Sequence, residues 1–119
     1  MPIKLHAPSL SPVAPGLWRV MAMGIYVSER YGVISVPNGF ITDLASVPRV
    51  PFVYAAFGGR ANVAAVFHDY LYMTKALSRK DADAVFLEIM NYTGDPTNKW
   101  ERYAMYIAVR LFGWGGYHA

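Results

Sequence analysis

The sequence predicts an α+β fold in which a small N-terminal antiparallel β-sheet is followed by three α-helices. β-branched and aromatic residues dominate residues 17–42 and are interrupted by turn signals, which is typical of short strands. In the second half of the chain, apolar residues recur at three- and four-residue spacing, which is typical of helices. A chain of 119 residues without an internal repeat is expected to form one domain, residues 17–113, between an extended arm (1–16) and a glycine- and aromatic-rich tail (114–119).

Proline positions predict the conformation of the N-terminal arm. Four of the eight prolines lie there, at Pro2, Pro8, Pro12 and Pro15. Because proline fixes φ and lacks an N–H, these residues exclude a helix and a central strand. We expect a proline-rich extended arm that lies across its own domain or across a neighbouring subunit.

The strands of the sheet are expected in two runs, Trp18 to Ser28 and Val33 to Ile41. Gly32 can supply the positive φ of a hairpin turn between them. Pro37 and Gly39 occupy the usual positions of a second turn, of type II or a related type. The expected product is antiparallel pairing.

Three helices are expected near residues 62–76, 79–93 and 96–112. The first is apolar nearly all round, as in a buried helix. The second begins with a capping box whose N-cap is Ser78 and ends at Gly94.

The third helix is expected to begin at Asp95 and Pro96, which have the residue types of an N-cap and a first-turn proline. Apolar residues repeat along it at three- and four-residue spacing. They are Trp100, Tyr103, Ala104, Ile107, Ala108 and Leu111.

The composition excludes several classes of protein. The chain is 55% apolar and 16% charged, which excludes intrinsic disorder and leaves few charges to solvate the surface. It contains no cysteine, so disulfides, thiolate zinc sites and a cysteine nucleophile are excluded. No apolar run reaches the roughly 18 residues of a membrane span, and we recognise no secretory signal. The eleven Lys and Arg residues are scattered rather than clustered, so no nucleic-acid partner is expected.

Carboxylates gather around one internal histidine. Asp43, Asp69, Asp81 and Asp83 lie within forty-one residues that also contain His68. This concentration is the main indication of a functional site in the sequence.

Helical geometry predicts which of these side chains meet. His68 and Tyr72 are four residues apart and share one face of the first helix, whereas Asp69 points about 100° away. Because the connection at residues 77–78 is short, the second helix should return beside the first and bring Asp83 near His68.

Two acids compete as the partner of His68. Asp81 is explained by the capping box and the helix dipole. Asp83 lies deeper in the helix, where a carboxylate needs a buried partner. Such a pair either pins two helices together as a polar bridge, or fixes the imidazole tautomer so that the other ring nitrogen can act as a base. Ser46 would complete the residue types of a hydrolytic triad, although no nucleophile-elbow glycines surround it.

Asp43 and Asp69 are the candidate metal ligands. Two carboxylates, with backbone oxygens and water, would form a hard-oxygen site that suits calcium or magnesium. Alternatively, Asp43 and Ser46 only form side-chain-to-backbone turns.

Three ordered motifs resemble a known family. They are FITDLASVP at 40–48, HDYLY at 68–72 and SRKDADAVF at 78–86. Over about residues 18–113 the chain closely resembles the small phage and prophage family catalogued as domain of unknown function 1353. The resemblance implies a bacteriophage or prophage origin and brings no established activity.

Small phage proteins of this type are expected to be accessory or virion-associated, for example in the tail, and to act through protein–protein contacts. The partners would then be phage structural subunits or a host protein, and a homo-oligomer is left open. The protein would be located in the host cytoplasm during infection or in the virion.

A second resemblance is local. His68-Asp69-x-x-Tyr72, followed by Asp83, is similar to the helix pair of phospholipase A-two. It implies that His68 is the base, Asp69 a calcium ligand and Asp83 the orienting acid of a metal-dependent hydrolase. The candidate catalytic residues are therefore His68, Asp83 and Tyr72.

Overall fold

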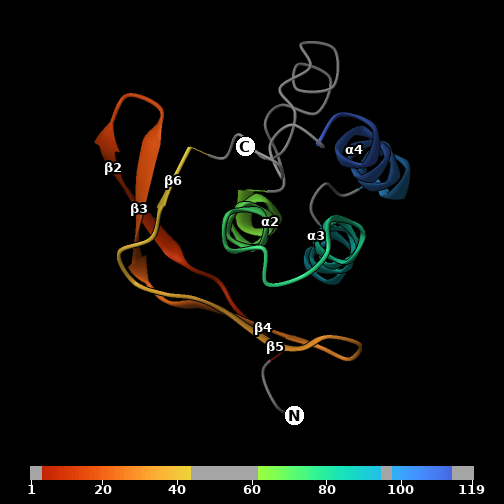
Figure 1. Ribbon diagram of the computed structural model, residues 1–119, viewed down its shortest axis with the longest axis horizontal. Coiled ribbons are helices and arrows are strands. Elements are labelled where there is room, and N and C mark those ends of the chain that lie inside the picture. Colours follow the sequence, from red (N-terminus) through yellow and green to blue (C-terminus); the bar gives the residue numbers. More distant parts are fainter. Residues whose placement is uncertain (1–3, 44–61, 95–97, 114–119) are drawn as a thin grey trace.

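A computed structural model describes residues 4–43, 62–94 and 98–113 of the chain. Within these residues the strands all precede the helices, and every strand pair is antiparallel, so the predicted α+β class is confirmed. Figure 1 shows the strands wrapped around two sides of the helices, with α2 at the centre.

The strands form two small sheets rather than the single sheet that we expected. The sheet orders are β1-β4-β5 and β2-β3-β6. The strands are β1 (Leu5–His6), β2 (Ser9–Ala14), β3 (Leu17–Ala22), β4 (Gly24–Ser28), β5 (Gly32–Val36) and β6 (Ile41–Thr42).

The two sheets separate where the run from Trp18 to Ser28 is broken, between β3 and β4. A Cβ atom on Gly24 would lie 2.9 Å from Cδ of Pro8 and 3.1 Å from Cζ of Phe67. Only glycine therefore lets the backbone pass this close to the helical layer, and the chain leaves one sheet and enters the other at this point.

The described part of the N-terminal arm, residues 4–16, contains strands that pair with other strands of the same chain. β1 pairs with β4, and β2 pairs with β3, so strand pairing begins at Leu5 rather than at residue 17. Both are edge strands of the described sheets. Pro12, opposite Trp18, is tolerated because an edge strand needs N–H donors on one side only.

Both predicted glycine turns are confirmed. Gly32 has φ 79° and Gly39 has φ 89°, which are left-handed values that favour glycine. In the first turn, the hydroxyl of Ser28 accepts hydrogen bonds from the backbone N–H groups of Arg30 and Tyr31.

The helices are α2 (Asn62–Thr74), α3 (Arg79–Thr93) and α4 (Lys99–Phe112). α3 has the predicted caps: Ser78 Oγ accepts from the backbone N–H of Asp81 at 3.1 Å, and Gly94 is left-handed. None of the described helices is long and apolar enough to cross a membrane.

The predicted start of the third helix is wrong by about one turn. α4 begins at Lys99, and its N-cap is Asn98, whose Oδ1 accepts a hydrogen bond from the N–H of Trp100 at 2.8 Å. Asp95 and Pro96 lie outside the described residues. An asparagine is as good an N-cap as an aspartate, so residue type alone could not choose between Asp95 and Asn98.

The core lies between the sheets and α2 and α3. α2 is buried along most of its length, as its sequence predicted. The largest fully buried apolar side chains are Tyr26, Tyr72, Phe67, Phe86, Leu71, Ile89 and Met90.

The predicted apolar repeat of α4 does not coincide with the face of the helix that packs against the core. Met105, Ala108 and Val109 are the buried residues of this helix. The larger residues of the predicted repeat are instead exposed: Trp100 by 73%, Tyr103 by 54%, Ile107 by 47% and Leu111 by 66%.

Candidate functional site

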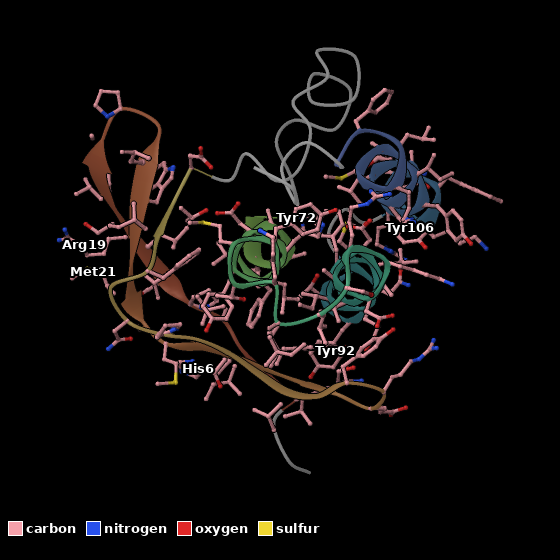
Figure 2. All side chains as sticks on the ribbon, in the orientation of Figure 1. His6, Arg19, Met21, Tyr72, Tyr92 and Tyr106 are labelled. Carbon is pink, nitrogen blue, oxygen red and sulfur yellow. The ribbon has the colours of Figure 1, made fainter. Side chains whose placement is uncertain are left out.

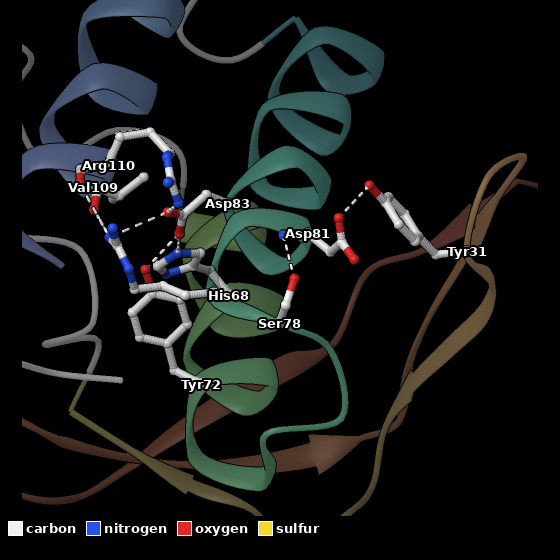
Figure 3. Close-up of polar contacts among 9 residues, drawn as sticks. Tyr31, His68, Tyr72, Ser78, Asp81, Asp83, Val109 and Arg110 are labelled. Carbon is white, nitrogen blue, oxygen red and sulfur yellow. Dashed lines mark hydrogen bonds and ion pairs between the residues drawn. The ribbon is translucent and has the colours of Figure 1, made fainter. Parts of the chain in front are cut away.

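His68 of α2 lies beside Asp83 of α3 (Figure 3). His68 Nε2 donates a hydrogen bond to Asp83 Oδ1 at 2.7 Å. Asp81 lies elsewhere, at the start of α3, where it accepts a hydrogen bond from the hydroxyl of Tyr31 at 3.0 Å. The prediction that Asp83 rather than Asp81 is the partner of His68 is confirmed.

Tyr72 joins the same carboxylate. Its ring lies one helical turn from that of His68, with ring centroids 4.0 Å apart, and its hydroxyl also donates to Asp83 Oδ1. The shared helix face that the four-residue spacing predicted is therefore the face that meets α3.

Two arginines that were not among the predicted site residues complete the site. Arg110 of α4 donates from Nη1 to Asp83 Oδ2 at 2.8 Å, and Nη1 of Arg79 lies 3.6 Å from the same oxygen. Arg79 Nη1 also donates to the carbonyl oxygens of Val109 and Arg110. These five side chains, Asp83, His68, Tyr72, Arg79 and Arg110, are called here the Asp83 cluster.

The pairing of one of these arginines with Asp83 could have been predicted from the sequence. Arg79 precedes Asp83 by four residues on a helix, which is a standard ion-pair spacing. Arg110 lies 27 residues away on another helix, and its pairing depends on how α4 packs against α3.

Burial and hydrogen bonding set the charges of the cluster. His68 and Asp83 are fully buried, and Tyr72 is 1% exposed. Burial alone would raise the pKa of Asp83, but the hydrogen bonds that it accepts outweigh burial and lower that pKa. Burial lowers the pKa of His68, and the hydrogen bond to Asp83 opposes this only in part. The pair therefore consists of a neutral imidazole and an ionised carboxylate, with two guanidinium groups as the compensating charges.

Burial also shifts the pKa of Tyr72. It raises the pKa of the phenol, and the hydrogen bond to the carboxylate of Asp83 raises it further. The phenol therefore remains a hydrogen-bond donor at neutral pH.

The arrangement joins three helices through one carboxylate. Among the described residues, no buried side-chain nitrogen or oxygen lacks a partner. A buried charge that accepts this many hydrogen bonds is well compensated, which suits a polar bridge between helices. The hydrogen bond to Asp83 also orients the His68 imidazole, as an acid does for a catalytic histidine base. The His68 ring, however, has no exposed surface. The catalytic roles of His68, Asp83 and Tyr72 remain predictions.

Asp69 faces away from this cluster, as predicted. Thr42 of β6 donates from Oγ1 to Asp69 Oδ2, and both residues are buried, whereas Asp43 is exposed. In residues 4–43, 62–94 and 98–113 there is no group of three or more His, Asp or Glu side chains that could hold a metal ion. The metal role of Asp43 and Asp69 remains a prediction, and Ser46 and the tail lie outside the described residues.

The outward face of α4 is a second candidate site, which sequence spacing alone did not identify. Trp100, Tyr103, Ile107 and Leu111 lie at intervals of three or four residues and so form one continuous row, called here the α4 stripe. Large apolar side chains that are exposed in a row are typical of interaction surfaces.

A groove runs beside this stripe, between α3 and α4. It consists of two hollows of about 280 and 370 Å³ that share the lining residues Asn91 and Tyr103, and it is called here the α3–α4 groove. Tyr103 belongs to both the groove and the α4 stripe, so the two surfaces adjoin. Other lining residues include Arg30, Tyr31, Glu88, Lys99, Arg102 and Tyr106.

Comparison with known proteins gives a family but no activity. No curated protein and no solved structure matches the chain. Residues 18–109 match a family model described as protein of unknown function (DUF1353), in agreement with the three motifs noted in the sequence. The Asp83 cluster lies almost wholly within the matched segment, with Arg110 directly after it. The chain therefore belongs to the DUF1353 family.

Proposed function

We propose that the protein is an accessory or virion-associated protein of a bacteriophage or prophage, and that it acts by binding another protein through the α4 stripe. The observation that carries this proposal is the exposure of four large apolar side chains along one face of α4. The phage origin is supported by the resemblance of the three sequence motifs to small phage and prophage proteins.

The energetics of the stripe support a binding role. Burying one large apolar side chain contributes roughly 1.5–3 kcal/mol relative to leaving it in water. Aromatic residues such as Trp100 and Tyr103 are also the types that dominate binding energy at protein interfaces. A stripe that helps neither the core nor solubility is therefore best explained by a partner that covers it.

Site-specific photocross-linking tests the proposal. A photoreactive benzoylphenylalanine replaces Ile107 in cells that carry the phage or prophage, and the same group replaces Met73 as the control. Met73 is 61% exposed and lies on α2 rather than on α4. We expect a discrete protein adduct from position 107 that is lost when Trp100→Asp is added. No adduct, or the same adducts from both positions, would overturn the proposal.

A metal-dependent hydrolase is the second candidate, favoured by the hydrogen bond between His68 Nε2 and Asp83. In this hypothesis Asp83 orients His68 as the base, and Asp43 and Asp69 hold calcium or magnesium. Assays of phospholipid and simple ester hydrolysis with added calcium test it. Activity is expected in the native chain and absent from His68→Gln, and an inactive native chain contradicts the hypothesis.

A further inference from the structure

We propose that the partner presents an acidic amphipathic segment, whose apolar side chains cover the α4 stripe while its carboxylates meet cations along the α3–α4 groove. The inference rests on the proposed function and names the chemistry of the partner.

Three cations lie along this groove. Lys99 and Arg102 line the hollow at the start of α4, and Arg30 lines the hollow at the β4–β5 turn. Two of them lie over aromatic rings: Lys99 Nζ is 5.5 Å from the ring centroid of Trp100, and Arg30 Cζ is 5.5 Å from that of Tyr31. The surface thus places cations directly beside apolar rings, which an amphipathic acidic segment complements.

The carboxylates near the groove accept hydrogen bonds from other side chains of the protein. Glu88 is the only acidic side chain that lines either described hollow, and it accepts hydrogen bonds from the hydroxyls of Tyr26 (2.9 Å) and Ser28 (3.1 Å). Asp81 accepts from Tyr31, another lining residue. These hydrogen bonds orient the carboxylates without removing their charge, so the lining of the two hollows carries three cations, Arg30, Lys99 and Arg102, against one acid, Glu88. The groove therefore presents a positive potential to a ligand.

Other occupants fit less well. A second copy of this chain that binds through the same face would bring the same cations against one another. A single-stranded nucleic acid would use the aromatic rings and the cations, but it would leave Ile107 and Leu111 without a complementary surface. An acidic helix with one apolar face can cover the α4 stripe and also pair with the cations of the α3–α4 groove.

Synthetic peptides test the inference with the full chain. The first probe is a fluorescein-labelled helical peptide of about 15 residues with leucine on one face and glutamate on the other. One control peptide has lysine in place of glutamate, a second has serine in place of leucine, and an oligothymidine of similar length serves as the nucleic-acid control. We expect the glutamate–leucine peptide to bind at least about tenfold more tightly than each control, and to bind more weakly as salt is added.

Charge reversal supplies the matched variants. The triple variant Arg30→Glu, Lys99→Glu and Arg102→Glu should reverse the preference and bind the lysine–leucine peptide. Arg19→Glu, on β3 at the opposite side of the molecule from Tyr106 (Figure 2), should leave the preference unchanged. Circular dichroism of each variant establishes that it is folded.

Several results would overturn the inference: equal binding of the glutamate and lysine peptides, equal binding of the serine control, tighter binding of the oligothymidine, or no binding of any probe. These failures are distinguishable from failure of the proposed function. A protein adduct at position 107 with no preference for the acidic peptide leaves the proposed function standing and removes only the acidic partner.

Discussion

At the scale of single residues, Asp83 is the centre of the polar structure. One oxygen accepts from His68 and Tyr72, and the other accepts from Arg110, so a single carboxylate contacts α2 and α4 from its place on α3. Asp81 has a simpler environment, with one side-chain bond from Tyr31.

This difference predicts unequal costs for two neighbouring substitutions. Asp83→Ala should lower the free energy of unfolding by about 2–4 kcal/mol, because it leaves buried donors and an arginine unpaired. Asp81→Ala should cost about 1 kcal/mol, because it removes one partly exposed hydrogen bond. Urea denaturation of both variants measures the two values, and an equal or reversed order contradicts the assignment of Asp83 as the central acceptor.

His68 predicts a pH dependence of stability. Burial keeps its pKa below the usual value, so the folded protein leaves it neutral while the unfolded chain takes up a proton below about pH 6.5. The unfolded state then binds more protons, and the free energy of unfolding should fall as pH is lowered, by up to about 1.4 kcal/mol per pH unit.

Two glutamine variants isolate this effect. His68→Gln retains a donor for Asp83 and cannot titrate, so it should lose this part of the pH dependence. His6→Gln, at an exposed position, should retain it. Urea denaturation between about pH 5.5 and 7.5 measures the slopes, and an unchanged slope in His68→Gln would exclude His68 as its source.

At the scale of elements, α4 has two apolar faces, and the smaller one packs inward. Val109→Ala should therefore cost about 2 kcal/mol, because Val109 is fully buried. Leu111→Ala should change stability by no more than about 0.5 kcal/mol, because Leu111 is 66% exposed. Thermal denaturation of the two variants compares them, and a large cost at Leu111 would show that the stripe packs within the chain.

The end of α4 requires a glycine for reasons of space. A Cβ atom on Gly113 would lie 2.5 Å from the carbonyl oxygen of Val109 and 2.7 Å from the hydroxyl of Tyr72. Gly113→Ala should therefore cost about 2 kcal/mol or more. Gly94→Ala, where there is open space and only the left-handed φ is strained, should cost about 1 kcal/mol. Equal costs in urea denaturation contradict this steric argument.

At the scale of the whole molecule, the metal hypothesis makes a prediction about global stability. If Asp43 and Asp69 hold calcium or magnesium, the ion binds only the folded state and stabilises it by roughly 2.7 kcal/mol at a hundred times the Kd. That gain corresponds to several degrees in Tm for a domain of this size. Asp43→Asn should abolish the shift, and a Tm that does not respond to millimolar calcium or magnesium contradicts the hypothesis.

The sequence by itself determined the features that depend on neighbouring residues. Gly32 and Gly39 predicted their turns because few other residues adopt a positive φ. Ser78 predicted the start of α3 through its own hydrogen bond to the next turn. His68 and Asp83 could be paired because helical periodicity and a short connection leave little freedom between two adjacent helices.

The tertiary structure alone decided the rest. Spacing shows which residues share a face of a helix, but not which face turns inward, so the direction of the α4 stripe depended on how Met105 and Val109 fit against the rest of the core. The division into two sheets at Gly24 depended on contacts with Pro8 and Phe67, which are remote in sequence. Such contacts are fixed by competition for buried space across the whole chain, and no local pattern of residues contains that information.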